Sequence, residues 1–391
     1  MNEHILPWDC KAFTLLVVLY PILHLYGIGL PNVSVADVML AVFIAYDLTR
    51  MVGTRELHLY PEWIPFAVYV LFAVMLGDAS SEMLAGLRFL AYLYSVAWLT
   101  PNYFDFSYGV VVLEKAVIAA SAWAIVQAIG IYAFGRYIPG TLNFLPIMRE
   151  DLLTYGEGYR SGVLRVRSFF GEPAHFAAYV LLYIQLVLDV YGVSKRRRRL
   201  VLAVAALVFS VSNLGYIGLA WVWFVYFASR LTSAAKTGVV DVRGLLGGIA
   251  SALTLPAFLA WFTNTEVFAT FVRRIDPEGG SVRGRLDGYY VFQPGVVGDQ
   301  AIRVFGHGFD DSQVIHYLPS IPLFYWRFGY LGTALFFLAV LISLSRNRER
   351  AGLHVVLLFI LLGIGSELFA SYLLILFMAF VNTCCTDKGI Q

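Results

Sequence analysis

The sequence predicts an all-α, polytopic membrane protein with about twelve transmembrane helices and two external loops. Two observations lead to this fold class. Of the 391 residues, 59% are hydrophobic and only 14% are charged, and the mean hydropathy is +0.72. A soluble domain carries about 45–50% apolar and about 25% charged residues. The apolar content suffices for about eleven or twelve helices of some 20 residues each. The composition therefore excludes a soluble enzyme, a disordered chain and a disulfide scaffold.

Apolar segments separated by charged or turn-forming residues mark the expected spans. Two neighbouring pairs among them are short, and each could form one bent or re-entrant unit, which leaves ten spans as the alternative. No internal repeat divides the chain, so we expect one membrane domain over residues 1–391. The spans lie near residues 12–30, 33–49, 62–78, 83–100, 110–134, 169–193, 200–212, 213–229, 244–263, 319–344, 351–365 and 367–383.

Basic residues in short loops predict the orientation of the chain, because such loops stay cytoplasmic. Four basic groups fall on one side if both termini are cytoplasmic. The longest polar segments, about residues 135–168 and 264–318, then form the two external loops. We interpret the run 195–199 as a topology signal at the membrane surface and expect no nucleic-acid partner. The four groups are Arg50 with Arg55, the run 195–199, Arg230 with Lys236 and Arg243, and Arg346 with Arg348 and Arg350.

The two external loops hold ten arginines and no lysine. A planar, permanently charged guanidinium binds phosphate through two parallel hydrogen bonds, which an ammonium cannot do. We therefore expect some of these arginines to bind phosphate. The alternative is ordinary surface charge paired with the acids of the second loop. The arginines are Arg136, Arg149, Arg160, Arg165 and Arg167 in the first loop, and Arg273, Arg274, Arg283, Arg285 and Arg303 in the second.

The start of the sixth expected span combines a helix terminus with two arginines. Pro173 is typical of a first helical position, and the free amides of a helix start attract anions. Arg165 and Arg167 come just before it. Glu172 and His175 are three residues apart and can meet across the first turn. They form either a helix cap or a catalytic pair.

The second external loop holds a second group of candidate residues. Residues 281–290 predict a short capped helix. Arg285 and Tyr289 are four residues apart and share a face of it. This arrangement could hold a phosphate beside a ring that stacks on a sugar.

Two histidines follow further along the same loop. Gly306 and Gly308 flank His307, which indicates a tight turn with a close backbone approach. His316 lies where the loop meets the tenth span, and a neutral imidazole there could take a proton from a sugar hydroxyl. The alternative for His316 is a structural interfacial histidine.

Several other chemistries lack their motifs in this sequence. No glycine-rich phosphate loop ends in Lys-Ser or Lys-Thr, which argues against nucleotide hydrolysis. No Cys or His cluster has zinc spacing, and no Gly-x-Ser-x-Gly elbow occurs. Asp310 and Asp311 are a weak candidate for a metal-binding pair. We therefore expect chemistry without a metal.

At these residues the sequence resembles the bacterial O-antigen polymerase (Wzy) and O-antigen ligase superfamily of membrane glycosyltransferases. Residues 167–178, RSFFGEPAHFAA, are similar to the family's arginine-containing Phe-x-Asn/Glu-Pro segment, in a form closer to the polysaccharide polymerases than to the ligases. Residues 212–218 lie where members often carry Ser-Arg-Ser/Gly-Gly, with an asparagine here in place of the usual arginine. Residues 306–309, His316 and residues 328–332 are similar to the family's end-of-loop pattern.

The resemblance covers about residues 160–335 and implies a function. The donor would be a glycan linked to undecaprenyl pyrophosphate, at the outer face of the bacterial cytoplasmic membrane, with the active site facing the periplasm or exterior. A polymerase passes the growing chain to a new lipid-linked repeat unit, and needs neither a nucleotide sugar nor a metal or other cofactor. Membrane lipid is an implied partner, and a chain-length regulator and a flippase are candidate further partners.

The resemblance also implies roles for single residues. Arg165 or Arg167, with Arg285, would hold the pyrophosphate and stabilise the charge that develops as it leaves. His316 would orient or deprotonate the acceptor hydroxyl, with Glu172 and His175 as second-choice participants. The residues implied in binding the substrate are Arg165, Arg283, His307, Tyr289, Tyr290 and Trp326, the last three as rings that stack on sugars.

Two alternative functions remain open at this point. An O-antigen ligase shares the chemistry but transfers the glycan to lipid A-core. A flippase or transporter of lipid-linked oligosaccharide is the alternative from another class. Transporters commonly show internal repeats and ionisable groups near the bilayer midplane, whereas few charges lie deep in the expected spans here.

Overall fold

The described part of the chain consists of helices and the segments that connect them. Within it no strand occurs, and one isolated bridge joins Tyr26 to Ile147. The all-α fold class is therefore confirmed for these residues. The computed structural model describes residues 6–51, 53, 58–75, 80–142, 145–148, 165–238, 242, 285–293, 296, 299–311, 314, 316–346 and 349–384.

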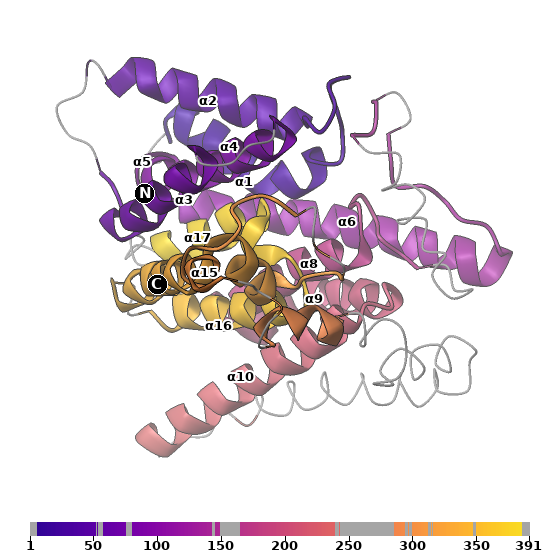
Figure 1. Cartoon of the computed structure of the whole chain (residues 1–391). Helices are drawn as coiled ribbons and strands as arrows, with labels where there is room; N and C mark the ends of the chain where they lie inside the picture. Colours follow the sequence, from indigo (N-terminus) through magenta and orange to yellow (C-terminus); the bar gives the residue numbers. More distant parts are fainter. Residues whose placement is uncertain are drawn as a thin grey trace. The chain divides into compact units, whose positions relative to one another are not determined.

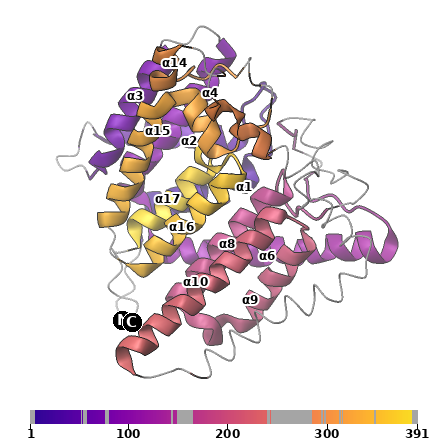
Figure 2. The same cartoon turned by 60° about the horizontal axis from the view of Figure 1, so that its bottom comes forward.

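The chain divides into two compact units. Figures 1 and 2 show the helices of the whole chain in two views, coloured along the sequence. Unit 1 comprises residues 1–24, 33–112 and 283–391, and unit 2 comprises residues 25–32 and 113–282. The single membrane domain expected from the sequence stays a prediction.

Unit 1 holds helices from both ends of the chain. Its core includes a cluster of phenylalanines in which Phe324 contacts Phe66 and Phe328, with ring centroids 6.0 and 5.3 Å apart. This cluster is buried. The elements are α1 (Trp8–Leu23), α2 (Val35–Met51), η1 (Pro61–Trp63), α3 (Ile64–Met75), α4 (Ser80–Tyr94), the π-helical η2 (Ser95–Leu99), α5 (Thr100–Tyr103), the start of α6 (Phe106–Phe134), η3 (Gly288–Phe292), α14 (Gln300–Phe305), α15 (Ser320–Arg346), α16 (Arg350–Gly365), η4 (Leu368–Ala370) and α17 (Leu373–Thr383).

Unit 2 is built from the rest of α6 and from α8 (Pro173–Val190), α9 (Gly192–Phe209) and α10 (Asn213–Thr237). Helices α9 and α10 both pack on α8 (Figure 2). The side chains of α8 from Phe176 to Leu188 are all buried, so α8 is the central helix of this unit.

Five helices among the described residues are long and apolar enough to cross a membrane. They support the expectation of a membrane protein. The count of about twelve crossings, the external loops and the orientation stay predictions, and the expected span 244–263 lies outside the described residues. The five helices are Met83–Tyr103, Phe106–Phe134, Pro173–Val190, Asn213–Thr237 and Ser320–Arg346; shorter apolar helices are Pro61–Met75, Arg350–Gly365 and Leu373–Thr383.

The basic run 195–199 does not form the loop that its charge predicted. It lies inside α9, which departs from helical geometry only at Arg196 (φ −131°, ψ 23°). Two helical segments meet at this kink, and Arg196 and Arg199 form ion pairs with Glu114 of α6. The apolar part of α9, residues 200–209, is about 15 Å long, which is shorter than the hydrocarbon core of about 30 Å. The expected crossing at 200–212 is therefore not a straight spanning helix.

Candidate functional site

The start of α8 in unit 2 is organised around a buried arginine. Arg167 is only 1% exposed. Its Nε donates to the Tyr137 hydroxyl at 2.9 Å, and its Nη1 donates to the Gly171 carbonyl at 3.1 Å. Through these two donors Arg167 supports the turn before α8, and its role in holding pyrophosphate stays a prediction.

The same turn is fixed to α6 through Ser168. Ser168 has a positive φ of 54°. Its backbone N–H donates to Gln127 Oε1 at 2.8 Å, and its hydroxyl donates to the Ala120 carbonyl at 2.7 Å. The ring of Phe169 stacks on Trp123, with centroids 5.9 Å apart. These contacts hold residues 167–170 in one conformation against α6.

The first turn of α8 begins where the sequence predicted. Glu172 is the N-cap residue with extended backbone geometry, and Pro173 is the first helical residue. The Glu172 side chain is exposed and makes no capping hydrogen bond, so the helix-cap interpretation is wrong for its carboxylate. His175 is half-buried on the same turn, and Arg165 is half-buried before it.

In unit 1 the helical turn at residues 285–287 leads directly into η3. Gly288 lies so close to the segment that follows the second loop that a Cβ there would overlap the Tyr317 carbonyl and come 2.7 Å from Pro319 Cδ. The predicted short helix is therefore packed against the residues that lead into α15. Arg285 is half-buried and makes no hydrogen bond or ion pair with another described residue.

The two tyrosines of η3 have different surroundings. The Tyr289 hydroxyl donates to the Ile364 carbonyl at 3.1 Å. Burial raises the pKa of the Tyr289 phenol, so this donor stays protonated. Tyr290 meets the exposed His316 edge to face, with ring centroids 5.3 Å apart. The structure thus brings His316 beside the element that follows Arg285.

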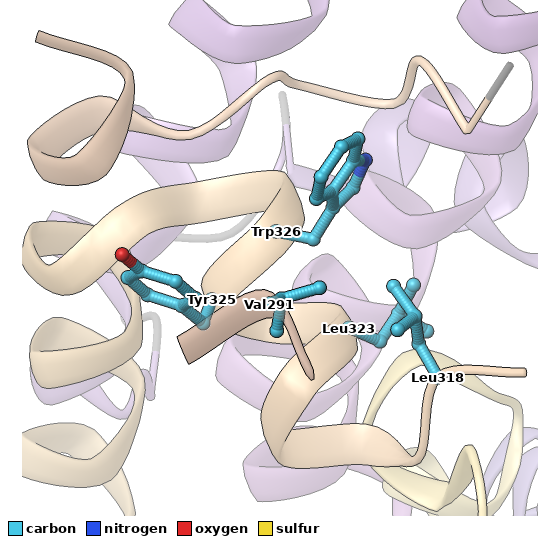
Figure 3. Packing of buried hydrophobic residues seen from close by; sticks show 5 residues of the cluster. All are labelled: Val291, Leu318, Leu323, Tyr325 and Trp326. Atoms are coloured by element: carbon cyan, nitrogen blue, oxygen red, sulfur yellow. The ribbon is translucent and has the colours of Figure 1, made fainter. Parts of the chain in front are cut away.

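A small apolar cluster supports this arrangement (Figure 3). Tyr290 packs against it. Its member Trp326 is only 3% exposed, and one face of its indole is covered by His307 in parallel stacking with centroids 3.9 Å apart. Trp326 is thus a buried support for His307, and its stacking on a sugar stays a prediction. The cluster consists of Val291, Leu318, Leu323, Tyr325 and Trp326.

The predicted tight turn around His307 is confirmed. Gly306 and Gly308 have φ angles of 77° and 70°. The backbone N–H groups of His307 and Gly308 donate to the carbonyls of Trp326 and Arg327 at 2.8 and 2.9 Å. A Cβ at Gly306 would overlap the backbone of Arg327. The turn is therefore held by direct backbone contact with α15.

Sequence reasoning missed two residues that hold this turn. Arg327 forms an ion pair with Asp311 and lies over the Phe309 ring, so Asp311, a weak metal candidate by sequence, has a cation as its partner. The Tyr69 hydroxyl lies 2.7 Å from the Phe305 carbonyl and 2.9 Å from that of Phe328. No local pattern predicts contacts between residues so far apart in the sequence.

The candidate residues thus form one group in each unit. Unit 2 holds Arg165, Arg167, Glu172 and His175, and unit 1 holds Arg285, Tyr289, Tyr290, His307, His316 and Trp326. Arg283 lies outside the described residues, as do Arg149, Arg160, Arg273 and Arg274.

Comparison with known proteins assigns the chain to no family. No protein-family model matches the sequence, and no curated protein matches it significantly.

Proposed function

We propose that the chain is a polysaccharide polymerase that transfers a growing glycan from undecaprenyl pyrophosphate to a lipid-linked repeat unit. One observation carries the proposal. The half-buried Arg285 and the exposed His316 belong to segments that pack together at the start of α15, through Gly288 against Tyr317 and through Tyr290 against His316. Helix α15 is apolar enough to cross a membrane. A permanent cation and a titratable base at the end of such a helix suit a substrate whose reacting end is a lipid headgroup.

The proposed reaction needs only these two groups at its centre. The acceptor hydroxyl oxygen attacks the anomeric carbon of the donor glycan, and the bond from that carbon to the pyrophosphate oxygen breaks. His316 takes the hydroxyl proton, and Arg285 stabilises the negative charge on the departing undecaprenyl pyrophosphate. Because the donor is already activated, the reaction uses no nucleotide sugar. The site would face the outside of the bacterial cytoplasmic membrane.

A reconstituted polymerisation assay tests the proposal. Purified protein in detergent is incubated with an undecaprenyl pyrophosphate-linked repeat unit, and the products are separated on a gel. We expect a ladder of products that Arg285→Ala reduces at least about 100-fold and His316→Ala by a similar factor, as for other groups that act in the transition state. Arg136→Ala, which removes an exposed arginine at the end of α6, is the matched control and should leave the ladder unchanged.

The possible outcomes separate the alternative functions. A ladder that persists in both variants refutes the assigned roles. Absence of a ladder, with transfer of the glycan to added lipid A-core, identifies a ligase instead. Movement of the lipid-linked unit across vesicles without a new glycosidic bond identifies a transporter.

A further inference from the structure

The basic run at the start of α9 contains two cations whose charge is used inside unit 2. Glu114 of α6 is buried and forms ion pairs with both Arg196 and Arg199. The Tyr183 hydroxyl also donates to this carboxylate, at 3.3 Å. The Arg196 guanidinium lies over the Tyr191 ring, 4.1 Å from its centroid. These two arginines therefore have a structural role.

The other three cations of the run take no part in this cluster. Lys195, Arg197 and Arg198 are exposed. None of them forms a hydrogen bond or ion pair with another residue in the part of the chain that the structure describes. The charge of these three side chains is therefore available at the surface of α9.

Helix α10 brings a further cation, Arg230, beside the start of α9. A Cβ at Gly192, the first residue of α9, would lie 3.6 Å from Arg230 Nη2. Lys236 follows on the last turn of α10 and is exposed. Asp189, an acid close by in the sequence, accepts a hydrogen bond from Gln185 at 2.8 Å. We call the five residues Lys195, Arg197, Arg198, Arg230 and Lys236 the basic surface.

Apolar side chains next to the basic surface indicate its depth in a membrane. Phe224 and Leu231 of α10 are 61% and 59% exposed, and Val201 of α9 is 57% exposed. Helices α8 and α10 are apolar enough to cross a membrane, and both approach the basic surface with their C-terminal ends. Exposed apolar residues beside exposed cations are typical of a helix end at the level of the lipid headgroups.

We propose that the basic surface binds the headgroups of anionic phospholipids. Lys195, Arg197 and Arg198 offer fixed positive charge to lipid phosphates, and Lys236 and Arg230 of α10 add to the positive charge of this surface. A zwitterionic lipid carries a compensating positive charge, so it gains less from such a surface. This role is separate from the proposed glycan transfer, because none of the five residues belongs to the group around Arg285 and His316.

Lipid binding by the whole purified chain tests this proposal. The protein in detergent is mixed with equimolar dioleoylphosphatidylglycerol and dioleoylphosphatidylcholine, and the bound lipids are counted by native mass spectrometry. We expect the wild type to prefer phosphatidylglycerol. The preference should fall roughly fivefold for each cation removed at low ionic strength, and so roughly 100-fold in K195Q/R197Q/R198Q. It should also weaken as salt is added.

Control variants separate charge from folding and from free phosphate. The charge-preserving variant K195R/R197K/R198K should keep the preference. R136Q should keep it too, because Arg136 follows the C-terminal end of α6, whereas Glu114 lies near its N-terminal end. Single variants R197Q and R198Q, at exposed positions, provide the graded effect if the triple variant does not fold. The proposal is overturned if K195Q/R197Q/R198Q keeps the preference, if R136Q loses as much as R197Q, or if equimolar inorganic phosphate displaces the bound lipid.

Discussion

Units 1 and 2 each contain an arginine that the sequence pattern assigned to pyrophosphate, and the fold uses the two arginines differently. Arg167 in unit 2 is 1% exposed and donates to Tyr137 and to Gly171. Arg285 in unit 1 is half-buried and makes no such bond with a described residue. The difference comes from their surroundings: residues 167–170 pack against α6, whereas Arg285 precedes η3 on a short surface turn. A motif rich in arginine therefore does not by itself identify the arginine that reaches a ligand.

The largest expected effect is on the folding of unit 2. Arg167→Ala leaves the Tyr137 hydroxyl and the Gly171 carbonyl without their buried donor and opens a cavity. We expect the free energy of unfolding to fall by about 3 kcal/mol. The measurement is thermal unfolding in detergent, with Arg136→Ala as a control that should change stability by less than about 0.5 kcal/mol. If Arg167→Ala unfolds like the wild type but loses glycan transfer, Arg167 is a ligand-binding group and the contrast between the two units is wrong.

The next largest expected effect is a difference in stability between two glycine variants, one in each unit. Gly329 has φ 60° and ψ −166°, a region that is essentially restricted to glycine. A Cβ there would also overlap the backbone of Val304. Gly135 in unit 2 has a similar φ of 62°, but a Cβ there would meet no atom within 4 Å.

Gly329→Ala and Gly135→Ala therefore form a matched pair. Both substitutions place a Cβ at a positive φ, and Gly329→Ala adds a backbone collision that Gly135→Ala does not. We expect Gly329→Ala to lose about 2 kcal/mol more than Gly135→Ala in thermal unfolding. Equal losses would show that the close approach of Gly329 to the Val304 backbone does not require a glycine.

Local patterns predicted much of the fold because they depend on neighbouring residues. Pro173 correctly marked the start of α8, and the expected span 319–344 corresponds to α15 at Ser320–Arg346. The sequence predicted a loop at residues 195–199 because they carry five consecutive positive charges. In the structure, Glu114 of a distant helix forms ion pairs with two of these residues. Charge neutralised by a remote partner leaves no local signal.

The sequence also predicted part of the candidate site, because that part depends on neighbouring residues. The alternation of Gly306, His307 and Gly308 correctly predicted the turn. The stacking of His307 on Trp326 and the ion pair between Asp311 and Arg327 join residues 16 or more positions apart. They arise from the docking of the loop on α15, which no local pattern in the sequence reveals.

The smallest change in stability is expected for Arg285→Ala, and this variant tests the contrast between Arg285 and Arg167 most directly. Arg285→Ala removes a side chain that bonds to no other described residue, so the free energy of unfolding should change by less than about 0.5 kcal/mol. Thermal unfolding measured beside Arg167→Ala checks this directly. A folded Arg285→Ala protein that has lost the product ladder assigns the loss to chemistry, because the fold is intact. If Arg285→Ala instead unfolds as readily as Arg167→Ala, its inactivity carries no information about phosphate binding. Arg285→Lys keeps the positive charge but replaces the planar guanidinium by an ammonium. If this variant folds but has lost glycan transfer, Arg285 acts through bidentate contact with phosphate and not through its charge alone.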